Sequence, residues 1–291
     1  NRYFILKLNF SMVDPKGDAE AVAASLHRHV NNAIEAFAVH YREALNTPID
    51  CHPTDSLWSL GRLLTAISTT PHKLYVLVDE YDNFANEVMI SPLRGTNRYE
   101  ELVQGEGTIK TLFKAIKAGA EGRGIDRVFL TGVSPVVLSD MTSGYNVAED
   151  LSPRPWLHDL CGFTETELRA ALEAVVAAHG LDTAQVDTAL NLMRDFYNGY
   201  RFTSQREERV YNPTLALYFL KRLVEDGVFP ERLLDDNLAM DRNRIQYVAR
   251  LPHGETLVNA ALNDAEPLAV AQLINRFGVQ DMLTAPRDPD F

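Results

Sequence analysis

The sequence predicts an α/β fold, with a parallel sheet and flanking helices in the first 160 residues, followed by an all-helical region. Short apolar segments at 3–10, 73–78 and 127–131 alternate with helical patterns, as in strand–helix–strand units. The segment 73–78 is apolar at nearly every position, which is typical of a strand in a parallel sheet with helices on both faces. After about residue 160 only helical patterns occur.

Helices are predicted between the strands and throughout the second half. Apolar residues recur at helical spacing from 18 to 45, with Asp18 as the expected N-cap, and further helical patterns cover 56–69 and 108–118. Two local signals mark helix starts later in the chain, a capping box at Thr164-x-x-Glu167 and the pair Asn212-Pro213. The helices expected there run from Thr164 to Gly180 and over about 183–197, 213–226, 241–250, 254–263 and 266–277. We therefore expect two domains, 1–160 and 161–291.

Composition narrows the classes of protein to consider. The 291 residues are 46% hydrophobic and 23% charged, as in an ordinary globular chain. The formal charge of −12 argues against a broad nucleic-acid-binding surface, although a local basic groove stays open. No apolar run approaches the roughly 18–20 residues that span a bilayer, so no membrane partner is expected. Cys51 and Cys161 are too few for a disulfide framework or a four-cysteine zinc site, and predict buried reduced thiols in a cytoplasmic protein.

Two carboxylates directly follow the most apolar predicted strand. Asp79 and Glu80 come after Val78, and ligands in open α/β sheets bind at the carboxyl ends of the strands. In nucleoside triphosphatases with this arrangement, the first acid holds Mg²⁺, usually through water, and the second polarises the attacking water. The alternative is a strand that simply ends in solvated acids. Asp82 either helps to hold the magnesium-bound water or caps the turn.

The next predicted strand ends in hydroxyl residues. Thr131 follows Phe129-Leu130, 131 − 79 = 52 residues after Asp79. Such ATPases place the side chain that senses the γ-phosphate at the tip of the neighbouring strand, which makes Thr131 a candidate. The alternative is a turn of small residues after a strand.

Five segments together resemble the AAA-ATPase-like family of bacterial P-loop proteins, in the family's order and at similar spacing over roughly residues 1–225. They are VDEYD at 78–82, FLTGVS at 129–134, SPRPWLHDLCGFTETE at 152–167, FYNGYRF at 196–202 and VYNP at 210–213. The resemblance implies a P-loop ATPase core with a helical lid, and ATP and Mg²⁺ as ligands. Members often carry a PD-(D/E)xK nuclease-like domain after the core.

Carried over position by position, the resemblance implies a role for three residues. Asp79 would be the Walker B aspartate that holds magnesium, Glu80 the catalytic glutamate and Thr131 the polar sensor. Arg201 could reach phosphate from the lid as a sensor or finger arginine, or could stack on Tyr197 or Tyr200 and stabilise the turn. His27 and His29 are two residues apart and do not share a helix face, so we expect no metal site there.

The chain departs from the family in one respect, because it contains no phosphate loop of the form G-x-x-x-x-G-K-[ST]. The segment 105–111 has a Lys-Thr pair, but Ile109 occupies the place of the second glycine, within an amphipathic helical pattern. Since the loop supplies the backbone N–H groups that bind phosphate, we expect this chain alone to bind nucleotide poorly. The chain opens with Asn1 and has no turn before Tyr3, so we expect the loop just upstream. Any nuclease domain is expected beyond Phe291.

The sequence therefore predicts the larger part of a Mg²⁺-dependent P-loop ATPase that is inactive by itself. One alternative is a non-hydrolysing scaffold that mediates contacts with a protein partner or within a homo-oligomer. A second is an ATPase that gates an attached nuclease, although nothing in these residues indicates contact with DNA.

Overall fold

The computed structural model describes residues 2–83, 107–132, 148–234, 256 and 259–260. They belong to two compact units, and the second begins at Ala148, before the predicted boundary near residue 160. The division into domains at 160 stays a prediction. The helices predicted at 241–250 and 266–277 lie outside the described residues. Of the helix predicted at 254–263, residues 256, 259 and 260 are described, and they are helical.

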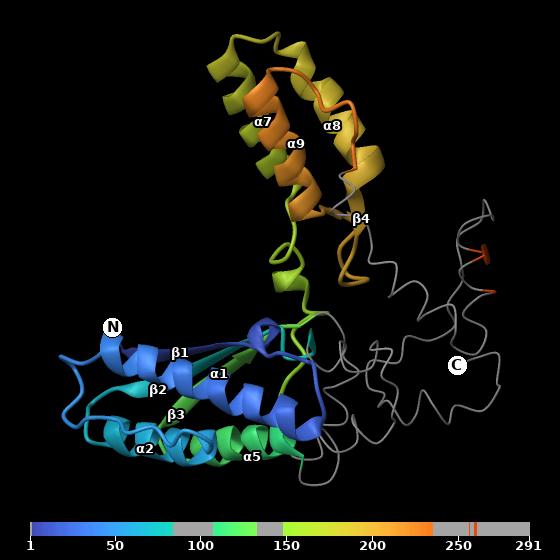
Figure 1. The fold of residues 1–291 in the computed structure, drawn as a ribbon. Helices are drawn as coiled ribbons and strands as arrows, with labels where there is room; N and C mark the ends of the chain where they lie inside the picture. The colour runs from blue at the N-terminus through green and yellow to red at the C-terminus, as the bar shows by residue number, and fades with distance from the viewer. Residues whose placement is uncertain (1, 84–106, 133–147, 235–255, 257–258, 261–291) are drawn as a thin grey trace. The chain divides into compact units, whose positions relative to one another are not determined.

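A parallel three-stranded sheet forms the centre of the first unit (Figure 1). Its strands are β1 (Tyr3–Asn9), β2 (Lys73–Asp79) and β3 (Ile125–Leu130), in the order β1-β2-β3. Asn9 lies opposite Asp79, and Val78 lies opposite Leu130, so the three strands end at the same edge of the sheet. The predicted parallel sheet is thus confirmed.

Three helices pack on one face of this sheet: α1 (Ala19–His40), α2 (Ser56–Ser68) and α5 (Thr108–Ala120) (Figure 1). The side chain of Asp18 caps α1 by accepting a hydrogen bond from the N–H of Ala21 at 2.9 Å, as predicted. α1 ends at His40 and not near residue 45 as predicted. The next residue, Tyr41, leaves helical geometry and packs its ring on Phe4. The buried face of the sheet is formed by Phe4, Leu6, Leu8, Leu74, Val76 and Val78.

The other face of the sheet differs from the expectation of helices on both sides. Side chains alternate across a strand, so Ile5, Leu77 and Phe129 lie on the face opposite Phe4, and all three are only half-buried. Among the residues that the structure describes, α1, α2 and α5 cover the Phe4 face and no helix covers this second face. We refer to it as the open face.

The second unit is built around three helices, α7 (Glu165–His179), α8 (Ala184–Tyr197) and α9 (Pro213–Asp226). The predicted capping box at the start of α7 is formed by Thr164 and Glu167, and Gly180 ends the helix with a left-handed φ of 62°. The Asn212 side chain caps α9 by accepting a hydrogen bond from the N–H of Leu215 at 3.1 Å. The core between the helices includes Leu172, Leu190, Met193, Tyr197, Phe219 and Leu223.

This unit is not all-helical, which corrects the sequence prediction. A two-stranded antiparallel hairpin, β4 (Asn198–Tyr200) and β5 (Val210–Tyr211), connects α8 to α9. Strands of three and two residues are too short to show an alternating pattern, so nothing in the sequence distinguished them from a turn.

Long-range contacts hold the hairpin in place. Tyr211 pairs with Phe163 through backbone hydrogen bonds, and its hydroxyl donates to the carboxylate of Glu165 at 3.0 Å. Arg194 donates two hydrogen bonds to the same carboxylate, at 2.8 and 3.2 Å. This guanidinium lowers the pKa of Glu165 from its ordinary value.

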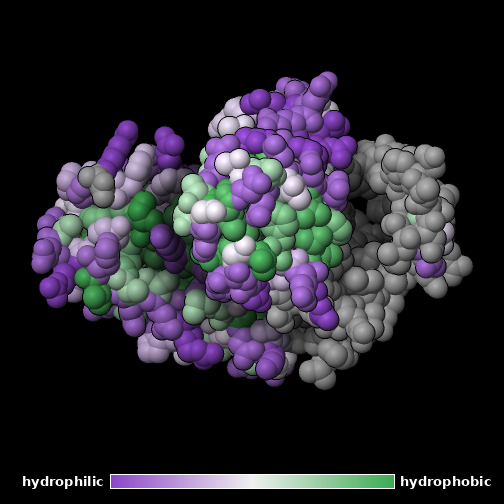
Figure 2. Space-filling view, turned by 90° about the horizontal axis from the view of Figure 1, so that it is seen from above, coloured by the Kyte–Doolittle hydropathy of each residue, from purple (hydrophilic) through white to green (hydrophobic). Residues whose placement is uncertain are grey.

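Hydrophilic and hydrophobic residues are interspersed on the face seen in Figure 2, where they are coloured purple and green. Several large apolar side chains of the second unit are exposed, among them Trp156, Leu160, Phe196, Leu217 and Val228. None of the described helices is both long and apolar enough to cross a bilayer.

Candidate functional site

The polar residues predicted at two strand ends are in contact. The hydroxyl of Thr131 donates a hydrogen bond to Asp79 Oδ1, and the backbone N–H of Glu80 donates to the same oxygen at 3.1 Å. The contact follows from the register, because β2 and β3 are neighbouring parallel strands that end at one edge. Asp79 Oδ2 accepts no hydrogen bond from the residues that the structure describes, which leaves it available to a ligand.

Backbone hydrogen bonds continue beyond the strands and position both side chains. The N–H of Thr131 donates to the carbonyl of Val78 at 2.8 Å, and the N–H of Tyr81 donates to the carbonyl of Thr131 at 3.2 Å. Between them, Glu80 adopts a left-handed backbone with φ of 51°, the one described non-glycine residue with a positive φ. Such a conformation costs roughly 1–2 kcal/mol and is found preferentially at functional sites.

A pocket of about 380 Å³ opens at this edge, on the open face of the sheet. Four polar residues line it, one of which, Lys7, projects from a strand otherwise rich in apolar residues. The polar lining comprises Lys7, Asn9, Asp79 and Thr131, and the apolar lining comprises Leu8, Leu77, Val78 and Phe129. Our sequence analysis missed Lys7 and Asn9. Asn9 could have been found, since it ends β1 as Asp79 ends β2.

The other predicted site residues do not line this pocket. Glu80 is partly exposed beside it, while Asp82 is buried, with its Oδ1 close to Gly132. Arg201 belongs to the second unit and is exposed. In the described part of the chain, neither the Tyr197 ring nor the Tyr200 ring lies under the Arg201 guanidinium. The structure thus brings together Asp79 and Thr131, and the roles of all five predicted site residues stay predictions.

The residues at this edge are compatible with magnesium. Mg²⁺ is usually bound by one or two carboxylates together with waters and substrate phosphates, rather than by a cage of protein ligands. Asp79 provides one carboxylate with an available oxygen, and Thr131 provides a neighbouring hydroxyl. No group of three or more His, Cys, Asp or Glu side chains that could hold a metal is found within the described ranges.

The Lys-Thr pair that superficially resembles a phosphate loop lies in a helix. Lys110 and Thr111 belong to the first turn of α5, and Ile109 is completely buried against the core. The Thr111 hydroxyl donates to the carbonyl of Gly107 at 3.0 Å. Thr111 therefore uses its hydroxyl to bond to the helix backbone.

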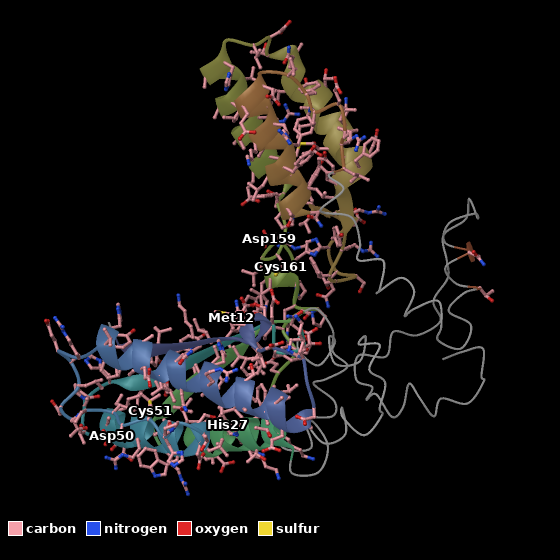
Figure 3. All side chains as sticks on the ribbon, in the orientation of Figure 1. Met12, His27, Asp50, Cys51, Asp159 and Cys161 are labelled. Carbon is pink, nitrogen blue, oxygen red and sulfur yellow. The ribbon has the colours of Figure 1, made fainter. Side chains whose placement is uncertain are left out.

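Among the described residues, no histidine or cysteine lines this pocket. His27 Nδ1 lies 2.9 Å from the hydroxyl of Ser56, between α1 and α2, in the region labelled in Figure 3. Cys51, labelled in the same region, is partly buried, whereas Cys161 is exposed. The expectation of two buried thiols was wrong for Cys161, because it lies in a turn that precedes α7 and not in a core-facing helix or strand, and Cys51 is buried only in part.

Gly132, next to Thr131, allows a close approach between the two strand ends. A Cβ added there would lie 2.5 Å from both Asp82 Oδ1 and Tyr81 Cε1. We expect Gly132→Ala to lower the free energy of unfolding by about 1–3 kcal/mol, measured by chemical denaturation. Gly61→Ala is the matched control, since a Cβ there meets nothing within 4 Å in the interior of α2. It should raise stability by about 0.5–1 kcal/mol. Equal stability of the two variants would contradict the packing described here.

Comparison with protein families agrees with this geometry. Residues 1–142 match the family model described as predicted AAA-ATPase. This stretch is therefore similar to the AAA-ATPase-like family. This AAA-ATPase-like region contains β1, β2, β3 and the pocket, together with Asp79, Glu80 and Thr131. Arg201 lies outside it.

One curated relative shares a longer stretch with the chain. An uncharacterized protein in the vnfD 5′ region of Azotobacter chroococcum mcd 1 is 30% identical over 176 residues. The match covers 60% of this chain and 30% of that protein, so the chain spans about three tenths of the relative's length. No solved structure matches the chain.

Proposed function

We propose that the AAA-ATPase-like region is the core of a magnesium-dependent ATPase. One observation carries the proposal: the Thr131 hydroxyl donates to Asp79 where two neighbouring parallel strands end, in a region of the predicted AAA-ATPase family. Magnesium bound there with the nucleotide would neutralise charge on the phosphates.

Each candidate residue has a distinct role in this proposal. Asp79 holds the magnesium-bound water through its available oxygen, and Thr131 orients that carboxylate and senses the terminal phosphate. Glu80 acts as the general base for the attacking water. Asp82 supports the turn that carries Glu80. In the second unit, which we propose to be a lid, Arg201 provides a positive charge for the phosphates.

The open face supports the presence of a further strand–loop–helix segment in the complete protein. The chain passes from β1 to β2 and then from β2 to β3, and it crosses the sheet in the same direction both times. Two crossover connections of the same handedness and direction place their helices on the same face of the sheet, as α1, α2 and α5 are placed here. A helix on the open face would fit a connection that runs in the opposite direction, from a strand beside β3 to β1. In the part of the chain described, no strand pairs with that outer edge of β3.

A phosphate loop between such a strand and helix would lie at the carboxyl edge, next to Asp79 and Thr131. Its helix would cover the part of the open face behind the pocket, where Ile5 and Tyr75 are half-buried. This segment would provide the backbone N–H groups that a triphosphate requires.

The test is to compare this chain with the protein extended by about 50–60 upstream residues, the length of one strand, loop and helix with their connections. We expect the extended protein to bind MgATP with measurable heat in isothermal titration calorimetry, and this chain to bind it at least about 100-fold more weakly. Lys110→Met is the control within the extended protein and should not change binding, because Lys110 lies in α5. Failure of the extended protein to bind MgATP would contradict the proposal.

A second candidate is a nucleotide-binding scaffold that does not hydrolyse ATP. It is favoured by one observation, that Glu80 does not line the pocket beside Asp79. Phosphate release by the extended protein under saturating MgATP decides between them: sustained turnover supports the ATPase, and binding without turnover supports the scaffold.

A further inference from the structure

We propose that β1 provides the phosphate-binding side of the pocket, with Lys7 and Asn9 donating hydrogen bonds to the terminal phosphoryl group of the nucleotide. This inference rests on the proposed function, since it concerns the same pocket. It adds two ligand-binding residues from a strand to which our sequence analysis assigned no site residue.

The register places both residues near Asp79. Asn9 lies directly opposite Asp79, and Lys7 lies opposite Leu77, one step back on the same face. Thr131 contacts Asp79 from the other side. Asn9, Asp79 and Thr131 therefore form a row along the carboxyl edge, with Lys7 behind it, and all four line the same pocket.

The hydrogen bonds of Asn9 determine which end of its amide can meet a ligand. Its Oδ1 accepts from the backbone N–H of Ser11 at 3.0 Å and from the Ser11 hydroxyl at 2.7 Å. The backbone N–H of Ser11 can only donate, so it identifies the atom facing Ser11 as the oxygen. The amide N–H groups are left as donors, on a partly buried side chain that lines the pocket.

Lys7 adds positive charge to this donor group. Its side chain is exposed on the open face, and it forms no ion pair with any residue in the described ranges. An exposed lysine on a strand face can be a simple solvated residue. Here, however, it lies within a pocket whose one acid, Asp79, is a candidate metal ligand.

The pocket thus combines two chemistries. Asp79 offers a carboxylate oxygen suited to a hydrated cation, while Lys7 and Asn9 offer N–H donors suited to anionic oxygen. A phosphoryl group complexed with magnesium requires both. The substrate class that fits is a magnesium-bound nucleoside triphosphate, with the donors on its terminal phosphate.

The experiment measures dissociation constants for MgATP and MgADP on the full-length protein by isothermal titration calorimetry. We expect Lys7→Met and Asn9→Asp each to weaken MgATP binding by about 10–100-fold, as for loss of a hydrogen bond to a charged group. MgADP binding should change by less than about threefold, since ADP lacks the phosphate contacted. Lys7→Arg should retain the MgATP affinity of the unmodified protein.

Two features of the design separate binding from folding. Asn9→Asp keeps an oxygen that accepts from Ser11 and so preserves the local turn, but it replaces the amide donors by an acceptor. Lys73→Met is the matched control, because Lys73 is an exposed lysine on the same face at the opposite end of β2. It should leave both affinities unchanged.

Each contrary result has its own meaning. Unchanged MgATP affinity in Lys7→Met and Asn9→Asp would overturn the inference and leave the proposed ATPase intact. Equal weakening of MgATP and MgADP would overturn the assignment to the terminal phosphate. Absence of nucleotide binding by the unmodified protein would overturn this inference and the proposed function together.

Discussion

Replacing Glu80 by glutamine is expected to lower ATP turnover by the full-length protein about 10²–10⁴-fold, the usual contribution of a general base. The MgATP dissociation constant should change little. Glutamine has the same shape but cannot accept the proton from water. It also retains the backbone N–H that donates to Asp79, so the carboxylate that orients the metal should stay in place. Steady-state phosphate release and calorimetry measure the two quantities.

Glu121→Gln provides a control for this experiment. Glu121 is an exposed residue that follows α5, away from the strand ends that carry the site. Its replacement should alter neither turnover nor binding. If the Glu80 variant hydrolysed ATP at the parental rate, Glu80 would not be the base. The scaffold hypothesis would then be favoured if the parental rate itself were negligible.

Replacing Asp79 by asparagine is expected to abolish most of the magnesium dependence of nucleotide binding. Asparagine keeps an oxygen that can accept from Thr131 and from the Glu80 N–H, so the strand ends should retain their geometry. It removes the negative charge that attracts the cation. We expect MgATP affinity to fall at least about tenfold, while ATP binding in the presence of a chelator stays the same.

The matched control is Asp126→Asn, at the amino end of β3 in the same sheet. Asp126 accepts a hydrogen bond from the Tyr3 hydroxyl at 2.6 Å, so it too is an aspartate with a specific structural partner. Its replacement should leave magnesium dependence unchanged. Titration of Mg²⁺ at constant ATP distinguishes the variants. Equal magnesium dependence in the Asp79 variant and the parent would exclude Asp79 as the metal-holding residue.

Local sequence patterns were sufficient for the elements and for part of the site. Buried apolar segments predicted all three strands of the sheet, and helical spacing predicted α7, α8 and α9 within one or two residues. The caps at Asp18, Thr164 and Asn212 form as predicted, because a cap depends on hydrogen bonds within one turn. The contact of Asp79 with Thr131 could also be expected, since parallel strands place their carboxyl ends together.

Other features depend on residues distant in the chain, and no local pattern encodes them. The hairpin β4–β5 is held by Phe163 and Glu165, more than 30 residues before it. The left-handed backbone of Glu80 is held by the strand pairing around it, against the intrinsic preference of glutamate.

The sequence by itself determined where the strands of the parallel sheet and the described helices lie, although not the short hairpin, and which acids follow the central strand. The tertiary structure alone decided that none of the described helices covers one face of the sheet and that Lys7 and Asn9 share the pocket with Asp79. The physical reason is that periodicity reports which side of an element is apolar, whereas register and sheet order decide which side chains become neighbours.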